Sequence, residues 1–130
     1  MPTTRRQFLT TLLLASVWPA GPITHADPNG ESPMYGLIAQ MKAAPGQRDA
    51  LIEILLAGTR DMPGCLSYVI ARDPADADGL WITEVWDSAE SHKASLQLPA
   101  VQDAITRGRP MIAGAGHRFE TLPAGGHGLG

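Results

Sequence analysis

Three side chains suited to proton transfer and aromatic stacking lie close together in the stretch from residue 80 to residue 98. Glu84 and Trp86 belong to a run of β-branched and aromatic residues that is typical of a strand, and their spacing places them on the same face. His92 follows six positions after Trp86, in a run with helical spacing. Histidine titrates near neutrality and can act as a general base. A strand that leads directly into a helix would therefore bring a carboxylate, an indole and an imidazole near one place.

The junction between this strand and this helix has its own sequence signals. Asp87, with Glu90 three residues later, is typical of a capping box at a helix start. Ala89, His92 and Leu96 then recur at the spacing of one helix face. We therefore predict a helix whose inner face carries His92.

Each of the three side chains has a functional and a structural interpretation. His92 is our candidate base, but it is also compatible with a core or rim histidine whose hydrogen bonds are satisfied. Trp86 can stack against a flat ring and form a pocket wall, or it can be a core or interface residue. Glu84 either orients the base or the substrate, or it pairs with Arg72 across the predicted hairpin, and we slightly favour the pair.

Two tyrosines and a serine extend the set of candidate substrate-binding residues, which also includes Glu84 and Arg72. Tyr35 and Tyr68 have hydroxyl groups that can hydrogen-bond a substrate oxygen, although buried tyrosines often bond protein groups instead. Ser95 lies about one helical turn after His92 and can help to orient it.

Other chemistries have weaker support in the sequence. His25 would leave with the N-terminal segment, and His92, His117 and His127 are too scattered to form a metal motif. Cys65 is the only cysteine, so it cannot form an internal disulfide, and a buried structural thiol is the favoured interpretation. The chain has neither a phosphate loop nor a dinucleotide-binding glycine pattern.

The elements that must position these residues follow from hydrophobic periodicity. In the second strand, Leu66, Tyr68 and Ile70 are expected to share one face. Turn-rich segments and Pro-Gly pairs separate the elements. The order β-α-β-β-α-β predicts an α+β, ferredoxin-like fold. Strands are expected at 34–42, 65–72, 80–86 and 117–122, with one helix at 47–62 and a second from 88 to 108 that is broken near Pro99.

Both faces of the predicted sheet are apolar, whereas the helices can cover only one. In the strand at 80–86, Ile82 and Trp86 are expected on one face, and Trp81 and Val85 on the other. Leaving the second face in water would forfeit about 25 cal/mol for each Å² of apolar surface. We therefore expect two copies to pack sheet on sheet as a homodimer, the arrangement of a dimeric α/β barrel.

The N-terminal part of the chain has the pattern of an export signal. Residues 4–9 match the twin-arginine pattern, and an apolar run and helix-breaking residues follow. We predict a signal peptide at 1–26, a flexible mature N-terminus at 27–33, a domain at 34–122 and a Gly-rich tail at 123–130. All 13 acidic residues but only 8 of the 10 basic residues lie after residue 26, so the formal charge falls from −3 to −5. We expect a periplasmic or secreted protein that binds neither nucleic acid nor, after cleavage, a membrane.

Short segments in a fixed order carry a resemblance to a known family. Pro45-Gly46-Gln47 follows the first strand, and 62–66 reads Met-Pro-Gly-Cys-Leu, similar to the segment Glu-Pro-Gly-Cys-Leu. The most specific segment is 84–88, Glu-Val-Trp-Asp-Ser, similar to Glu-x-Trp-x-Ser. With the broken second helix, these segments resemble the antibiotic biosynthesis monooxygenase family, in its quinol monooxygenase branch. Many members place the helix histidine about nine residues after the tryptophan, where this chain has Ser95.

The resemblance implies a dimer with one pocket per subunit, between the sheet and the helices. It also implies oxygenation of a quinol or a related phenolic or polycyclic substrate by dioxygen, without flavin, metal or haem. His92 would be the base and Trp86 the pocket wall. Two alternatives stay open: a haem or small-molecule binding module without turnover, and an isomerase or decarboxylase on the same barrel.

Overall fold

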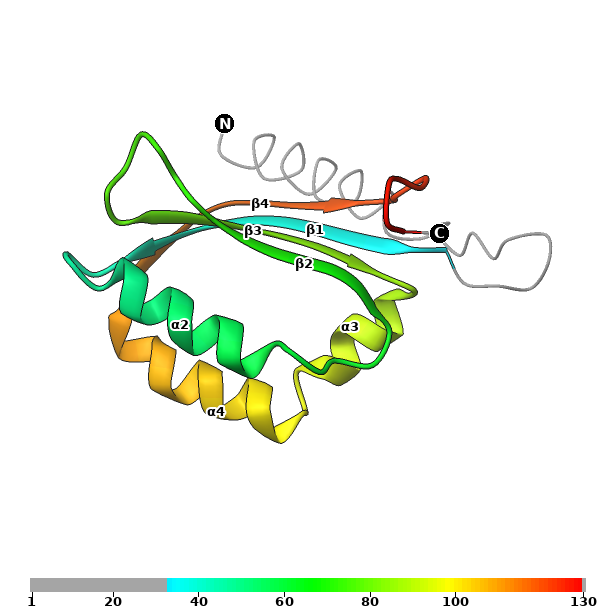
Figure 1. Ribbon diagram of the computed structural model, residues 1–130, viewed down its shortest axis with the longest axis horizontal. Coiled ribbons are helices and arrows are strands. Elements are labelled where there is room, and N and C mark those ends of the chain that lie inside the picture. Colours follow the sequence, from blue (N-terminus) through cyan, green and yellow to red (C-terminus); the bar gives the residue numbers. More distant parts are fainter. Residues whose placement is uncertain (1–32, 130) are drawn as a thin grey trace, which may run out of the picture. The chain divides into compact units, whose positions relative to one another are not determined.

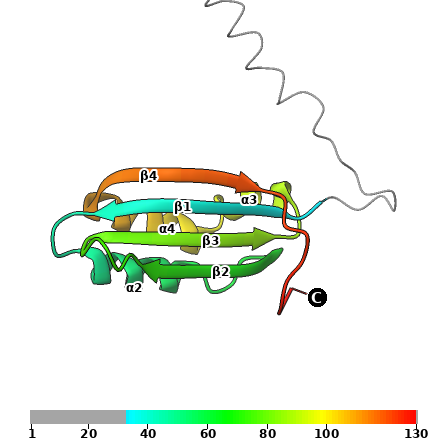
Figure 2. The ribbon, with the colours of Figure 1, turned by 90° about the horizontal axis from the view of Figure 1, so that it is seen from above.

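The computed structural model describes residues 33–129, and its strands form one antiparallel sheet. The sheet has four strands in the order β2-β3-β1-β4, so the first strand lies between the third and the last (Figure 2). The predicted ferredoxin-like α+β fold is confirmed, whereas the pairing of two sheets into a dimeric barrel stays a prediction. The elements are β1 (Tyr35–Ala43), α2 (Arg48–Gly58), β2 (Cys65–Arg72), β3 (Gly79–Trp86), α3 (Ala89–Ser95), α4 (Pro99–Gly108), the short 3-10 helix η2 (Arg109–Met111) and β4 (Ile112–Thr121).

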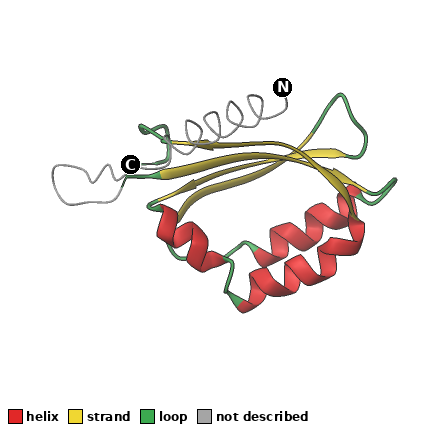
Figure 3. Cartoon of the chain, turned by 180° about the vertical axis from the view of Figure 1, so that it is seen from behind, coloured by secondary structure: helices red, strands yellow, loops and turns green. Residues whose placement is uncertain are grey.

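The helices α2, α3 and α4 lie on one side of the sheet (Figures 1 and 3). The predicted second helix is two helices, because α3 ends at Ser95 and α4 begins at Pro99, whose fixed backbone angle suits a first helical position. The first helix ends at Gly58, four residues before the predicted end at Met62. Gly58 packs closely against α4, where an added Cβ would meet Ala104. Met62 is nevertheless buried, 8% exposed, so its apolar spacing misled the prediction of the helix end.

The register of the sheet aligns the candidate residues in rows. Tyr35 of β1 lies opposite Trp86 of β3, and Leu37 lies opposite Glu84. Tyr68 of β2 lies on the other side of Glu84. Residues directly opposite one another project from the same face, so this end of the helix-covered face carries two tyrosines, a carboxylate and an indole.

A bulge in β2 changes one predicted face. The register shifts between Cys65 and Ser67, and Cys65 lies opposite Trp86. Leu66 is 41% exposed, so the prediction that it shares a face with Tyr68 is wrong. Cys65 takes that place and packs against the cluster around Trp86.

The buried residues between sheet and helices form two clusters. The aliphatic cluster lies beneath α2, and the tryptophan cluster lies at the end where α3 follows β3. The opposite face of the sheet keeps apolar side chains in solvent among the described residues: Val69 is 52% and Phe119 is 53% exposed. The aliphatic cluster consists of Ala43, Leu51, Ile52, Leu80 and Ile82, and the tryptophan cluster of Met62, Trp86 and Val101.

Candidate active site

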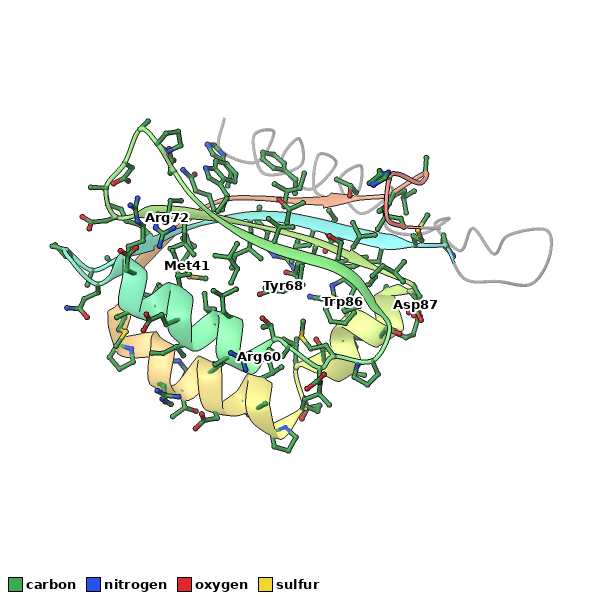
Figure 4. The ribbon with its side chains drawn as sticks, in the orientation of Figure 1. Met41, Arg60, Tyr68, Arg72, Trp86 and Asp87 are labelled. Atoms are coloured by element: carbon green, nitrogen blue, oxygen red, sulfur yellow. The ribbon has the colours of Figure 1, made fainter. Side chains whose placement is uncertain are left out.

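Trp86 and Glu84 form the fixed part of the site. They project from the same face of β3, and both are buried. The indole Nε1 of Trp86 donates a hydrogen bond of 2.9 Å to Oε1 of Glu84. The indole itself is fully enclosed in the layer between the sheet and the helices (Figure 4). The bond satisfies the indole N–H and fixes one oxygen of the acid.

His92 completes the site from α3. Its ring centroid is 5.5 Å from that of Trp86, with the two planes at 73°, and 5.0 Å from that of Tyr35, with the planes at 30°. Its Nε2 lies 3.9 Å from Oε1 of Glu84. The structure thus brings His92, Trp86, Glu84 and Tyr35 together, as the sequence predicted for the first three.

The start of α3 differs in detail from the prediction. The N-cap is Ser88, whose hydroxyl accepts a hydrogen bond from the backbone N–H of Ser91 at 3.1 Å, so the predicted capping box from Asp87 is wrong. Asp87 is still tied to the sheet, because its backbone N–H donates to the carbonyl of Gly64 at 2.9 Å. The inner face of α3 carries His92 and Ser95, whereas the predicted inner residues Ala89 and Leu96 are exposed.

Ser95 supports the helix rather than the imidazole. Its hydroxyl donates a hydrogen bond of 2.6 Å to the backbone carbonyl of His92, and its side chain is buried. Any orienting effect on His92 is therefore transmitted through the backbone of α3.

The pKa values of one carboxyl group and two phenols in the site are raised, which favours their protonated forms. Burial raises the pKa of Glu84, and the hydrogen bond from Trp86 and the charges of His92 and Arg118 oppose that rise. Burial also raises the pKa of Tyr68 far above its ordinary value, with the Glu84 carboxylate adding to the effect. Burial and the nearby Glu120 raise the pKa of Tyr35, whereas Arg118 lowers it. Both phenols therefore stay neutral hydrogen-bonding groups at physiological pH.

Sequence reasoning missed two charged residues that face this site from β4. Arg118 lies opposite Ala39 and Glu120 lies opposite Leu37, so both project from the same face as Tyr35. Arg118 Nη1 and Glu120 Oε1 are 3.3 Å apart, and both side chains are more than half exposed. The alternation of charged and uncharged residues in 117–120 was the available signal. Reading 118 and 120 as the inner face required the register with β1, which the sequence does not show.

Arg72 lies away from the other candidates. It is opposite Leu80 at the far end of β2, and its Nε binds Oδ1 of Asp49 at 2.9 Å (Figure 4). The favoured pairing of Arg72 with Glu84 is therefore wrong, because the register places Tyr68 opposite Glu84. A separate shallow hollow of about 210 Å³ lies beside Gln40, Lys42 and Asp76, and it is lined by none of the candidate site residues.

Two further properties of the described residues bear on function. In 33–129, no group of three or more His, Cys, Asp or Glu side chains is arranged to hold a metal ion. Over the same range, no helix is long and apolar enough to cross a membrane. The predicted signal peptide lies outside the described residues.

The chain is similar to a known protein family and to several solved structures. Residues 34–107 match the family described as "Antibiotic biosynthesis monooxygenase". A solved structure described as a "putative Antibiotic biosynthesis monooxygenase" from Chloroflexus aurantiacus is 68% identical, with a TM-score of 0.73, and covers 75% of this chain and 99% of its own. A second protein of that description, from Caulobacter crescentus, is 20% identical, with a TM-score of 0.66 and coverage of 72% and 92%.

A Pseudomonas aeruginosa protein is 23% identical, with a TM-score of 0.63, and covers 73% of this chain and 98% of its own. At these lower identities the likeness shows the fold alone. No match was found among curated proteins.

Proposed function

Because this chain belongs to the antibiotic biosynthesis monooxygenase family, we propose that it oxidises a quinol or a related phenolic ring with dioxygen, without a cofactor. The family and its relatives support a monooxygenase-type activity in general. The observation that carries the finer proposal is the position of His92 against two aromatic rings and a buried carboxylate.

The proposed reaction needs no reductant beyond the substrate. His92 takes the proton of a phenolic hydroxyl, and the resulting anion passes one electron to dioxygen. The two radicals combine, which forms a carbon–oxygen bond to the ring, and the imidazolium returns its proton as the peroxide loses water. Hydroquinone and dioxygen then yield hydroxyquinone and one water, which balances atoms and electrons. Base catalysis of this kind contributes about 10²–10⁴ in rate.

The surroundings of His92 suit an aromatic anion. The Tyr35 ring lies tilted by 30° beside the imidazole, and the buried indole of Trp86 meets the imidazole in a T-shaped contact. The Arg118 guanidinium on β4 supplies a positive charge on the same sheet face. We propose that Trp86 forms the wall, and that Tyr35 and Tyr68 hydrogen-bond the substrate oxygens.

The test is oxygen consumption by the purified mature protein with a panel of substituted hydroquinones, with products identified by mass spectrometry. We expect uptake of one dioxygen per hydroxyquinone formed, unchanged after treatment with a chelator. The variant His92→Gln should lose about 10²–10⁴ of kcat/KM. The matched control His127→Gln changes an exposed histidine of the C-terminal tail and should keep full activity. Loss of turnover on metal removal, or full activity in His92→Gln, would contradict the proposal.

We also propose that the active form is a homodimer. The supporting observation is the apolar sheet face opposite the helices, where Val69 and Phe119 are half exposed. Burying such a face against its copy gains about 25 cal/mol per Å². Sedimentation of the mature protein at micromolar concentration should give a dimer, and a well-folded monomer would refute this.

Export by the twin-arginine route is a proposal that rests on the sequence pattern of residues 1–26 alone. Fusion of this segment to a reporter should direct the folded reporter out of the cytoplasm. Replacing Arg5 and Arg6 together by Lys should abolish that export.

A further inference from the structure

Glu84 stands between the two aromatic nitrogens of the site. Its Oε1 accepts the hydrogen bond from Trp86 Nε1 at 2.9 Å, and the same oxygen lies 3.9 Å from Nε2 of His92. Glu84 is 8% exposed, so water has little access to its oxygens. A buried carboxylate that costs free energy to desolvate is expected to have polar partners, and the structure offers a hydrogen bond from Trp86 and the His92 imidazole at ion-pair distance.

The position of this oxygen has a consequence for the imidazole. A neutral imidazole carries one N–H and one lone pair, and the partner of one nitrogen decides which tautomer is present. An ionised carboxylate only accepts hydrogen bonds, so it favours a hydrogen on the nitrogen that faces it. We propose that Glu84 is a positioning residue that holds His92 as the Nε2–H tautomer and thereby makes Nδ1 the nitrogen that takes the substrate proton.

Trp86 takes part in this arrangement as well as forming a wall. Its N–H fixes Oε1, because a carboxylate held by one strong donor has less freedom to rotate away from His92. The indole and the Tyr35 ring then limit the tilt of the imidazole from two sides. The chain of contacts runs from the Trp86 N–H through Glu84 to Nε2 of His92, which leaves the opposite edge of the ring for substrate.

Other charged and titratable groups surround the site, but among residues 33–129 Glu84 is the acid within 4.0 Å of an imidazole nitrogen of His92. Arg118 and Glu120 face the site from β4, and Tyr68 and Cys65 face it from β2. Glu120 is a carboxylate on the same sheet face and pairs with Arg118 at 3.3 Å. It is therefore a matched control for Glu84: an acid of the same type and face without the contact to Nε2.

The proton path follows from this assignment. The phenolic proton moves to Nδ1, and the imidazolium that forms keeps its Nε2–H toward Glu84. The carboxylate stabilises that cation and takes no proton itself. The same proton later leaves from Nδ1 toward the peroxide, so Glu84 is unchanged over the cycle. The proton path rests on the proposed function, whereas the assignment of the tautomer does not.

The experiment is nitrogen NMR of the full chain labelled at histidine, which distinguishes a protonated ring nitrogen from one with a lone pair. His92→Gln identifies the signals of His92. We expect the Nε2–H form in the wild type at alkaline pH. The same oxygen faces Trp86 and Nε2, so Glu84→Gln keeps an acceptor for both and should keep the Nε2–H tautomer. Glu84→Leu removes that acceptor, so the Nδ1–H tautomer should appear beside the Nε2–H form. The matched control Glu120→Leu should leave the wild-type tautomer unchanged.

Kinetics supply the second measurement. Glu84→Leu should lower kcat/KM at least about tenfold, because Nδ1 is no longer kept free of its proton and the imidazolium that forms loses its carboxylate. An Nδ1–H form in the wild type, or the same tautomer population in wild type and Glu84→Leu, would overturn the inference. If the tautomers behave as expected but no quinol is oxidised, only the proposed function fails. If oxidation occurs with an unchanged tautomer population in Glu84→Leu, only this inference fails.

Discussion

The two ends of the layer between sheet and helices are built by the same strands but bury different chemistry. At one end, β1 and β3 contribute Ala43, Leu80 and Ile82 to the aliphatic cluster. At the other end, the same two strands contribute Tyr35, Glu84 and Trp86 to the surroundings of His92.

This difference separates the residues that stabilise the fold from the residues that form the candidate site. Apolar side chains stabilise the folded state when buried, whereas a buried carboxylate has a desolvation cost that reappears in its raised pKa. Shifted titratable groups beside aromatic walls are typical of functional sites. The aliphatic end should therefore govern stability, and the tryptophan end should govern activity.

The largest expected effect on stability comes from the aliphatic end. Leu51 is 0% exposed, and Leu51→Ala should lower the free energy of unfolding by about 2–5 kcal/mol, because it removes buried methyl groups and leaves a cavity. Urea denaturation measures this change. The activity per folded molecule should stay at the wild-type value, because Leu51 belongs to the aliphatic cluster whereas His92 lies beside Trp86 of the tryptophan cluster. A fall in the kcat of the folded fraction would contradict the assignment of stability to one end and activity to the other.

A smaller effect is expected when the donor to Glu84 is removed. Trp86→Phe leaves the buried carboxylate without its hydrogen bond, which should cost about 1–3 kcal/mol in addition to the lost volume. Trp81→Phe is the matched control, because Trp81 also donates to an acid, Asp73, at 3.3 Å in a more exposed place. Denaturation of both variants should show the larger loss for Trp86. Equal losses would mean that burial of Glu84 adds nothing to the value of its hydrogen bond.

The desolvation cost of Glu84 predicts that a substitution which removes its charge stabilises the protein at high pH, whereas the two substitutions above destabilise it. Its pKa is raised in the folded state, so the stabilising contribution of its protonated form is lost as pH rises through the folded pKa. Glu84→Gln cannot ionise and should be about 1 kcal/mol more stable than the wild type at pH 8. That difference should disappear toward pH 4. Thermal unfolding at several pH values measures it, and a Glu84→Gln protein that is less stable at every pH would show that the contacts of Glu84 outweigh its desolvation.

The sequence predicted the fold because its signals are local. Alternation marked β1, β2 and β3, and Pro63 and Gly64 marked a break between the first helix and β2, although α2 itself ends at Gly58. Its errors came from features that depend on packing. Gly58 ends α2 early against Ala104, and the bulge before Ser67 exposes Leu66.

The candidate site was predictable only where strand and helix adjoin in the chain. Glu84, Trp86 and His92 lie within nine residues, so one turn brings them together. Arg118 and Glu120 were missed, and Arg72 was misplaced, because their neighbours depend on strand order and register. No periodicity within a single strand reveals which strand lies beside it.

The smallest expected effect concerns Ser95, which is buried in α3 and whose hydroxyl donates its hydrogen bond to the backbone. Its hydroxyl bonds the carbonyl of His92 at 2.6 Å, a bond with a net value of about 1 kcal/mol, and alanine regains about 0.5 kcal/mol of helix propensity. Ser95→Ala should therefore cost about 0.5 kcal/mol and change kcat/KM less than twofold. Ser88→Ala removes the N-cap of the same helix and should cost more, about 1 kcal/mol. Denaturation and steady-state kinetics of both variants test this order. A tenfold loss of kcat/KM in Ser95→Ala alone would mean that the hydroxyl turns to the imidazole during catalysis, and the positioning of His92 would then involve Ser95 as well as Glu84.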